Sequence, residues 1–183
     1  MAMFGRNEME KGMKAEERAA KFFENNGYHV RDLRDDDYYR ERDVDFKLYK
    51  WGEKDKLVEV KSSTTAAKTG KIIVEDILNV NKGKIGWLWY TEADYITVVS
   101  QEKMFMYKPS EMRQYITRVK EEYNKIELTD DIFAPNTSSV DYNYMAEVRQ
   151  LEDPTFKGSM SQIYYVDFHK YAALGYYTRE IIL

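Results

Sequence analysis

The chain contains no cysteine among its 183 residues. This absence excludes disulfide frameworks, zinc–thiolate sites and thiol nucleophiles. The chain has only three prolines but sixteen tyrosines, a composition that argues against disorder. At roughly 150 residues per domain, the length predicts a single domain over residues 1–183, which can bury a core without metal or disulfide support.

Long apolar runs are also lacking. No stretch approaches the roughly 20 apolar residues of a membrane helix, and the first residues, MAMFGR, lack the apolar segment of a signal peptide. We therefore expect a cytoplasmic protein with no membrane partner. The net charge of −4 argues against coating nucleic acid by bulk charge, although residues 50–84 carry eight lysines against five acids. Any polyanion is expected to bind the first half of the chain, which contains these lysines.

Hydrophobic patterning predicts two helices and a series of short strands. The predicted helices span residues 14–26 and 110–124, and residues 129–143 are predicted to be irregular. The predicted strands are 28–33, 43–49, 57–61, 71–74, 85–90, 95–100, 104–107 and 163–168. This order predicts an α/β fold around a mixed sheet.

The most informative segments are two alternating ones, 43–49 and 57–61, joined by a polar link. They predict a β-hairpin. If the hairpin is symmetric about Gly52, Asp45 faces Glu59 across the two strands. Directly opposed residues share a face of a sheet, with Cβ atoms roughly 4.5–5.5 Å apart. The hairpin is therefore expected to bring two carboxylates together.

The same symmetry places Asp43 opposite Lys61, which shares a face with Glu59 because strand side chains alternate. Opposed carboxylates repel each other unless a cation lies between them, and Mg²⁺ prefers oxygen ligands. A bound metal polarises water and offsets charge on a phosphoryl group, and a lysine can orient that water. The alternative is a salt-bridged, solvated sheet face without chemistry.

Asp45 followed by Glu59-Val60-Lys61 resembles the signature of the PD-(D/E)XK nuclease superfamily, which includes restriction endonucleases, Holliday-junction resolvases and many phage nucleases. The resemblance covers about residues 14–107 and leaves residues 108–183 as an unassigned C-terminal extension. Val44 stands before Asp45, where many members have proline. Asp43 is a second candidate acid, so which aspartate acts stays open.

The resemblance implies a restriction-endonuclease-like central mixed β-sheet flanked by helices. It also implies a metal-dependent deoxyribonuclease that hydrolyses DNA phosphodiester bonds with Mg²⁺ or Mn²⁺, in phage or mobile-element DNA processing. Asp45, Glu59 and the carbonyl of Val60 would hold the metal, and Lys61 would be catalytic.

Glu16 is the fourth candidate catalytic residue. It is similar to the acid that the N-terminal helix contributes in resolvase-like members. Residues three, four and seven positions beyond Glu16 are small or apolar, whereas those beyond Glu17 are mostly polar. Glu16 is thus expected to start the buried stripe of its helix. The alternative is an acid that merely favours the helix dipole in the first turn.

Two other function classes stay open. One is a non-catalytic nucleic-acid-binding or assembly protein on the same fold, although such a protein has no need of Asp45, Glu59 and Lys61. The other is an interaction protein that depends on its acidic, tyrosine-rich C-terminal part, which could form a homodimer or partner surface, or a second part of the core.

Overall fold

The computed structural model describes residues 3–79, 82–127, 146–152 and 160–183. The chain divides into two compact units. Unit 1 contains Met1–Gly70, Thr91–Pro109 and Tyr177–Leu183, and unit 2 contains Lys71–Tyr90 and Ser110–Tyr176. The expected core of residues 14–107 therefore contributes to both units. The prediction of a single domain stays a prediction.

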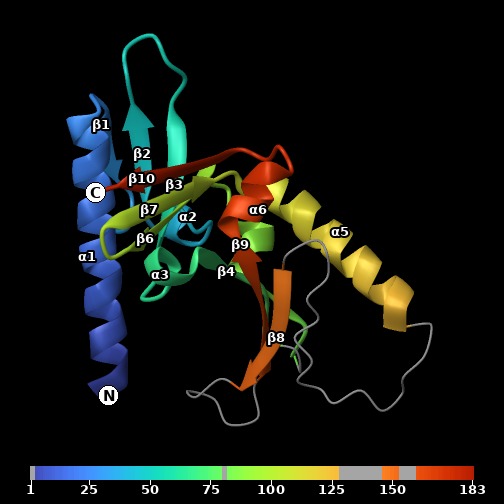
Figure 1. Ribbon diagram of the computed structural model, residues 1–183. Coiled ribbons are helices and arrows are strands. Elements are labelled where there is room, and N and C mark those ends of the chain that lie inside the picture. Colours follow the sequence, from blue (N-terminus) through green and yellow to red (C-terminus); the bar gives the residue numbers. More distant parts are fainter. Residues whose placement is uncertain (1–2, 80–81, 128–145, 153–159) are drawn as a thin grey trace. The chain divides into compact units, whose positions relative to one another are not determined.

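Unit 1 is built on a mixed six-strand sheet with the strand order β1-β2-β3-β6-β7-β10 (Figure 1). Its strands are β1 (His29–Asp32), β2 (Phe46–Tyr49), β3 (Lys56–Ser62), β6 (Tyr95–Ser100), β7 (Lys103–Tyr107) and β10 (Thr178–Ile182). β3 and β6 pair in parallel, and every other neighbouring pair is antiparallel. The α/β class and the mixed sheet predicted from the sequence are thus confirmed.

Helix α1 (Met3–Asn25) packs against β3 and β6. Ala15, Ala19 and Phe23 on one helix face join a core cluster with Phe46 and Val58 of the sheet. Small alanines let the helix approach the strands closely. The helix begins well before the predicted residue 14, because residues 3–13 contain good helix formers and no proline.

The β2–β3 hairpin has the register that symmetry about Gly52 predicts. Phe46 lies opposite Val58, Lys47 opposite Leu57 and Leu48 opposite Lys56. The β2–β3 ladder ends at Phe46, so Asp45 lies just outside β2. Two short helices follow β1 and β3, namely α2 (Asp37–Arg40) and α3 (Ala66–Thr69).

Unit 2 contains a small antiparallel sheet with the order β5-β4-β9-β8. The strands are β4 (Lys71–Asn79), β5 (Lys84–Ile85), β8 (Ala146–Glu152) and β9 (Met160–Asp167). Its helices are α4 (Trp87–Tyr90), α5 (Pro109–Glu127, whose first residue belongs to unit 1) and α6 (Phe168–Ala173). The prediction of a strand over residues 85–90 is wrong, because its last four residues form α4.

Asp76 is a charged side chain in the interior of unit 2, and three side chains hydrogen-bond to it. The Asp76 side chain has no exposed area, and it accepts hydrogen bonds from Trp89 Nε1 at 2.6 Å, Lys120 Nζ at 2.6 Å and Gln162 Nε2 at 3.0 Å. A buried carboxylate is costly unless it is paired in this way. The cluster therefore connects β4, α4, α5 and β9.

The residues predicted to be irregular, 129–143, lie outside the described part of the chain. Among the described helices, none combines the length and the apolar character needed to cross a membrane.

Candidate active site

Asp45 is held at the end of the β2–β3 ladder by two backbone hydrogen bonds and one hydrogen bond to its side chain. Its N–H donates to the Val58 carbonyl at 3.0 Å, and its own carbonyl accepts from the Leu33 N–H at 2.8 Å. Its Oδ2 accepts a hydrogen bond from the Val60 N–H at 2.7 Å. The carboxylate of Asp45 therefore reaches across to β3, the strand that carries Glu59 and Lys61.

Glu59 and Lys61 lie on the same face of β3, as their spacing predicts. Lys61 Nζ is 2.7 Å from Glu59 Oε1 and 3.0 Å from Asp43 Oδ2. The Glu59 side chain is only 6% exposed. Asp43 has a φ of 51°, in the left-handed region that aspartate tolerates better than most residues, and its carbonyl accepts a hydrogen bond from Thr91. The expected contact between Asp43 and Lys61 is thus confirmed.

The carboxyl groups of Asp45 and Glu59 each bind a proton more readily than isolated acids do. Burial raises the pKa of Asp45 to about 6, against the opposing effect of the Val60 N–H, and the nearby charge of Glu16 raises it further. Burial also raises the pKa of Glu59 to about 8, with added repulsion from Asp45 and Asp43 that Lys61 only partly offsets. Asp45 and Glu59 each affect the pKa of the other, so the two carboxyls lie close together. The predicted meeting of these two acids is therefore present.

Lys61 stays a cation in this setting. Burial lowers its pKa, but Glu59 and Asp43 outweigh that effect, so the net pKa lies above the ordinary value. The ammonium group is fixed between two carboxylates. It supplies one positive charge to a cluster that contains three acids, counting Asp45.

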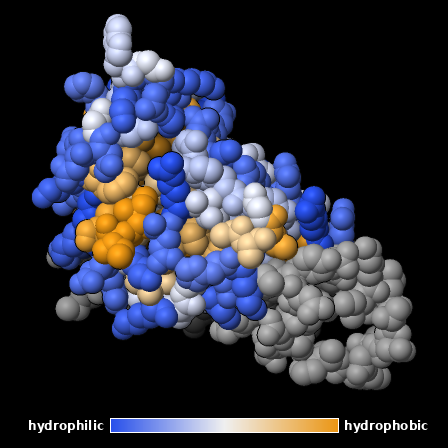
Figure 2. All heavy atoms as spheres, turned by 45° about the horizontal axis from the view of Figure 1, so that its top comes forward, coloured by the Kyte–Doolittle hydropathy of each residue, from blue (hydrophilic) through white to orange (hydrophobic). Residues whose placement is uncertain are grey.

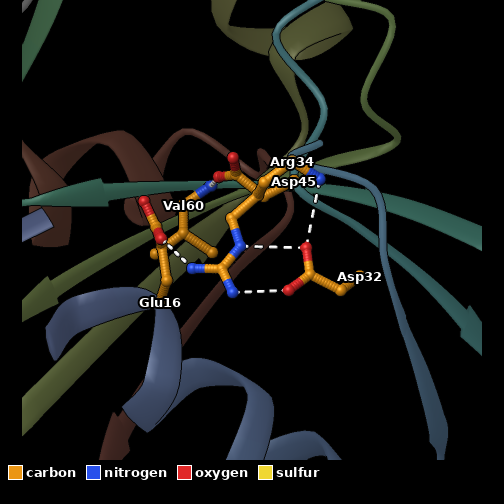
Figure 3. A network of polar contacts seen from close by, with 5 residues as sticks. All are labelled: Glu16, Asp32, Arg34, Asp45 and Val60. Atoms are coloured by element: carbon orange, nitrogen blue, oxygen red, sulfur yellow. Dashed lines mark hydrogen bonds and ion pairs between the residues drawn. The ribbon is translucent and has the colours of Figure 1, made fainter. Parts of the chain in front are cut away.

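Glu16 lies on the sheet side of α1, and its side chain is 19% exposed. It forms an ion pair with Arg34, whose guanidinium lies between the carboxylates of Glu16 and Asp32 (Figure 3). Arg34 also donates its Nε–H to Asp32 at 2.9 Å. The hydrogen bond to Asp32 and the charge of Glu16 raise the pKa of Arg34, although burial opposes them. The cation that pairs with the Glu16 carboxylate is therefore an arginine of the same chain.

Arg34 and Asp32 are site residues that the sequence reasoning missed. A glutamate on a buried helix stripe indicates that some cation lies nearby. The sequence offers many lysines and arginines for that role, and the stripe does not select one of them. Arg34 also places its guanidinium carbon 5.5 Å from the centre of the Phe46 ring, beside the residue that follows Asp45.

The donor atoms around Asp45 fit a hard divalent cation with a mostly water shell. Among the described residues, no group of three His, Asp or Glu side chains is placed to hold a metal. A cation would rely on Asp45, Glu59 and the Val60 carbonyl. That carbonyl faces the same edge of β3 as the Val60 N–H, because a strand residue directs both groups to one neighbour. The pKa values of both acids are raised mainly by burial, and the charge of Asp45 also raises the pKa of Glu59.

Comparisons with family profiles, with curated proteins and with solved structures find no match.

Proposed function

We propose that the chain is a metal-dependent deoxyribonuclease with a restriction-endonuclease-like unit 1, acting in phage or mobile-element DNA processing. The observation that carries this proposal is the convergence of Asp45, Glu59 and Lys61 at the end of the β2–β3 ladder. The half-buried Asp45 and the buried Glu59, both with raised pKa values, and one fixed lysine form an arrangement suited to phosphodiester hydrolysis.

The roles follow from the chemistry of each group. Asp45, Glu59 and the Val60 carbonyl would hold Mg²⁺ or Mn²⁺, which would polarise water and offset charge on the phosphoryl group. Lys61 is a point charge that orients the attacking water and neutralises a phosphate oxygen. Hydrolysis forms a bond from the water oxygen to phosphorus and breaks one ester P–O bond, whose oxygen leaves with a proton.

Glu16 acts through Arg34 in this proposal. Its carboxylate holds the guanidinium beside the site, where a forked cation suits a DNA phosphate. Asp32 fixes the other side of the same guanidinium. Arg34 is therefore a positioning and phosphate-binding residue, and Glu16 supports it.

A second candidate is the non-catalytic nucleic-acid-binding or assembly protein on the same fold. It is favoured by the internal pairing of the charges, since Lys61 bonds Glu59 and Asp43 while Arg34 bonds Glu16 and Asp32. Pairs of this kind can serve structure alone.

Cleavage assays separate the two candidates. The purified chain is incubated with linear, closed circular, single-stranded and branched DNA in Mg²⁺, Mn²⁺ or EDTA. We expect cleavage with either metal and none in EDTA. Asp45→Ala and Glu59→Ala should each lose activity, whereas Glu24→Ala, which changes an exposed glutamate of α1, should cut normally. Wild-type cleavage by either site variant excludes that residue as a metal ligand.

Lys61 gives a separate test of the assigned roles. An ammonium group cannot ligate a cation, so Lys61→Ala should still bind Mn²⁺ by calorimetry and yet fail to cut. Preserved cleavage together with lost Mn²⁺ affinity would contradict the role of Lys61.

A further inference from the structure

Trp51 occupies the tip of the β2–β3 hairpin and is fully exposed, at 101% of its reference area. The Glu53 N–H donates to the Lys50 carbonyl at 3.0 Å, and Gly52 has a φ of 78°. This pattern is that of a type II turn with Trp51 at its second position. A Cβ built on Gly52 meets no atom within 4 Å, so the tip stands in open space.

The Trp51 indole does not pack against the rest of the fold. Tryptophan normally packs its large ring and pairs its N–H. Within the described part of the chain, the Trp51 ring makes no stacking or cation–π contact and its N–H has no hydrogen-bond partner. An exposed aromatic ring at a protruding turn is available to an external partner.

The charge around Trp51 selects a polyanion as that partner. Residues 47–56 carry a net charge of +2, because Glu53 and Asp55 pair with three of the four lysines and balance only two of their charges. Arg31 lies directly opposite Lys47 on the neighbouring strand, and Asp55 Oδ2 lies 3.1 Å from Lys47 Nζ, so one carboxylate faces two cations there. Figure 2 shows that mostly hydrophilic residues surround the protruding end that comes forward in that view.

The tip is also braced before any partner arrives. The Lys50 and Lys56 ammonium groups lie 4.8 Å and 5.1 Å from the centre of the Tyr28 ring. The Tyr28 hydroxyl donates to Glu53 Oε2 at 3.0 Å. A turn held in this way loses little conformational freedom on binding.

We propose that the hairpin tip binds a single-stranded segment of DNA, with Trp51 stacked on an unpaired base and the neighbouring lysines on phosphates. This inference rests on the proposed nuclease function and narrows its substrate to DNA with unpaired bases. Trp51 lies six positions after Asp45, beyond strand β2, which at the usual strand rise corresponds to at most about 20 Å.

Binding is measured in EDTA, so that it does not depend on cleavage. The probes are a fluorescent oligothymidylate, a blunt duplex, and the same duplex with a single-stranded overhang, followed by anisotropy. Trp51→Ala should weaken binding of the first and third probes by about tenfold to a hundredfold, with little change on the blunt duplex. Trp51→Phe should keep most of the affinity. Ile182→Ala, an 81% exposed residue of β10, is the matched control and should bind as wild type does.

Three binding outcomes overturn the inference. Equal affinity of Trp51→Ala and wild type for every probe excludes stacking, and an equal loss on the blunt duplex indicates a backbone contact instead. If the wild type binds none of the probes, the tip does not bind DNA, and a protein is the remaining candidate partner. A Trp51 effect in EDTA without cleavage in Mg²⁺ would sustain this inference while refuting the nuclease.

Discussion

At the scale of single residues, the Asp45–Glu59 pair determines how pH acts on the metal-free chain. Both carboxyls bind protons more tightly in the folded chain than at their ordinary pKa values of 3.8 and 4.5. Their contribution to folding is therefore greatest at low pH. It is lost as pH rises through about 6 and about 8.

Glu59→Gln should remove much of this pH dependence, because glutamine is a neutral mimic of the protonated acid. In EDTA, the wild-type melting temperature should fall between pH 5 and pH 9, with a free-energy loss on the order of a few kcal/mol. The variant should show a much smaller fall. Glu24→Gln serves as the control, and an identical slope for Glu59→Gln and wild type would refute the assigned shift.

Glu16 and Glu17 are adjacent acids that the helix separates onto different faces. Glu16 contacts Arg34, whereas Glu17 is exposed. Glu16→Gln should reduce cleavage about a hundredfold by releasing Arg34 from its position. Glu17→Gln should cut almost normally. Rates and melting temperatures are recorded together, and a lower melting temperature for Glu16→Gln with an unchanged rate would indicate a purely structural ion pair.

At the scale of elements, Gly86 explains the turn between β5 and α4. A Cβ at this position would lie 2.3 Å from the Glu75 carbonyl oxygen, and the Gly86 N–H donates to the Asp76 carbonyl at 2.7 Å. Only glycine permits so close an approach of two backbones.

Gly86→Ala should destabilise the chain by about 3 kcal/mol or more, because backbone must move to admit the methyl group. Gly83→Ala is the comparison, since Gly83 has a φ of 61° but open space around it. That change should cost about 1 kcal/mol, from backbone strain alone. Urea denaturation measures both changes, and equal costs would show that the close approach is absent.

Sequence patterns predict local pairing well and tertiary contacts poorly in this chain. The β2–β3 register is predictable because Gly52 lies midway between two alternating segments. The α4 turn is not, because the alternation in residues 85–90 is overridden where Gly86 packs on β4. The Arg34–Glu16 ion pair and the pairing of β10 with β7 escape notice for a similar reason, since each joins residues that are distant in sequence. The catalytic roles of Glu16, Asp45, Glu59 and Lys61 stay predictions.

At the scale of the whole molecule, the two units are interleaved along the chain. The chain passes between them at residues 70/71, 90/91, 109/110 and 176/177. Strand β10 returns to the sheet of unit 1 and pairs with β7 over five residues. Ile181 packs against the core cluster that contains Phe23 and Phe46. The unassigned extension of the sequence prediction therefore contributes to both sheets.

Removal of residues 177–183 should lower the stability of unit 1 by about 2 kcal/mol or more, since it uncovers part of the core and the edge of β7. The shortened chain should melt at a lower temperature and lose DNA cleavage. Ile182→Ala in the full chain is the control for the loss of an exposed side chain. Unchanged melting of the shortened chain would show that β10 is dispensable.

The pairing of β7 with β10 also has a consequence for the order of synthesis. Thr178 is made 71 residues after Tyr107, its partner in the ladder. At about 5–20 residues per second, this gap amounts to roughly 4–14 s. During that interval β7 presents an open strand edge to any other nascent chain. Slower translation between the two strands should therefore increase aggregation during expression, whereas slower translation before β6 should not.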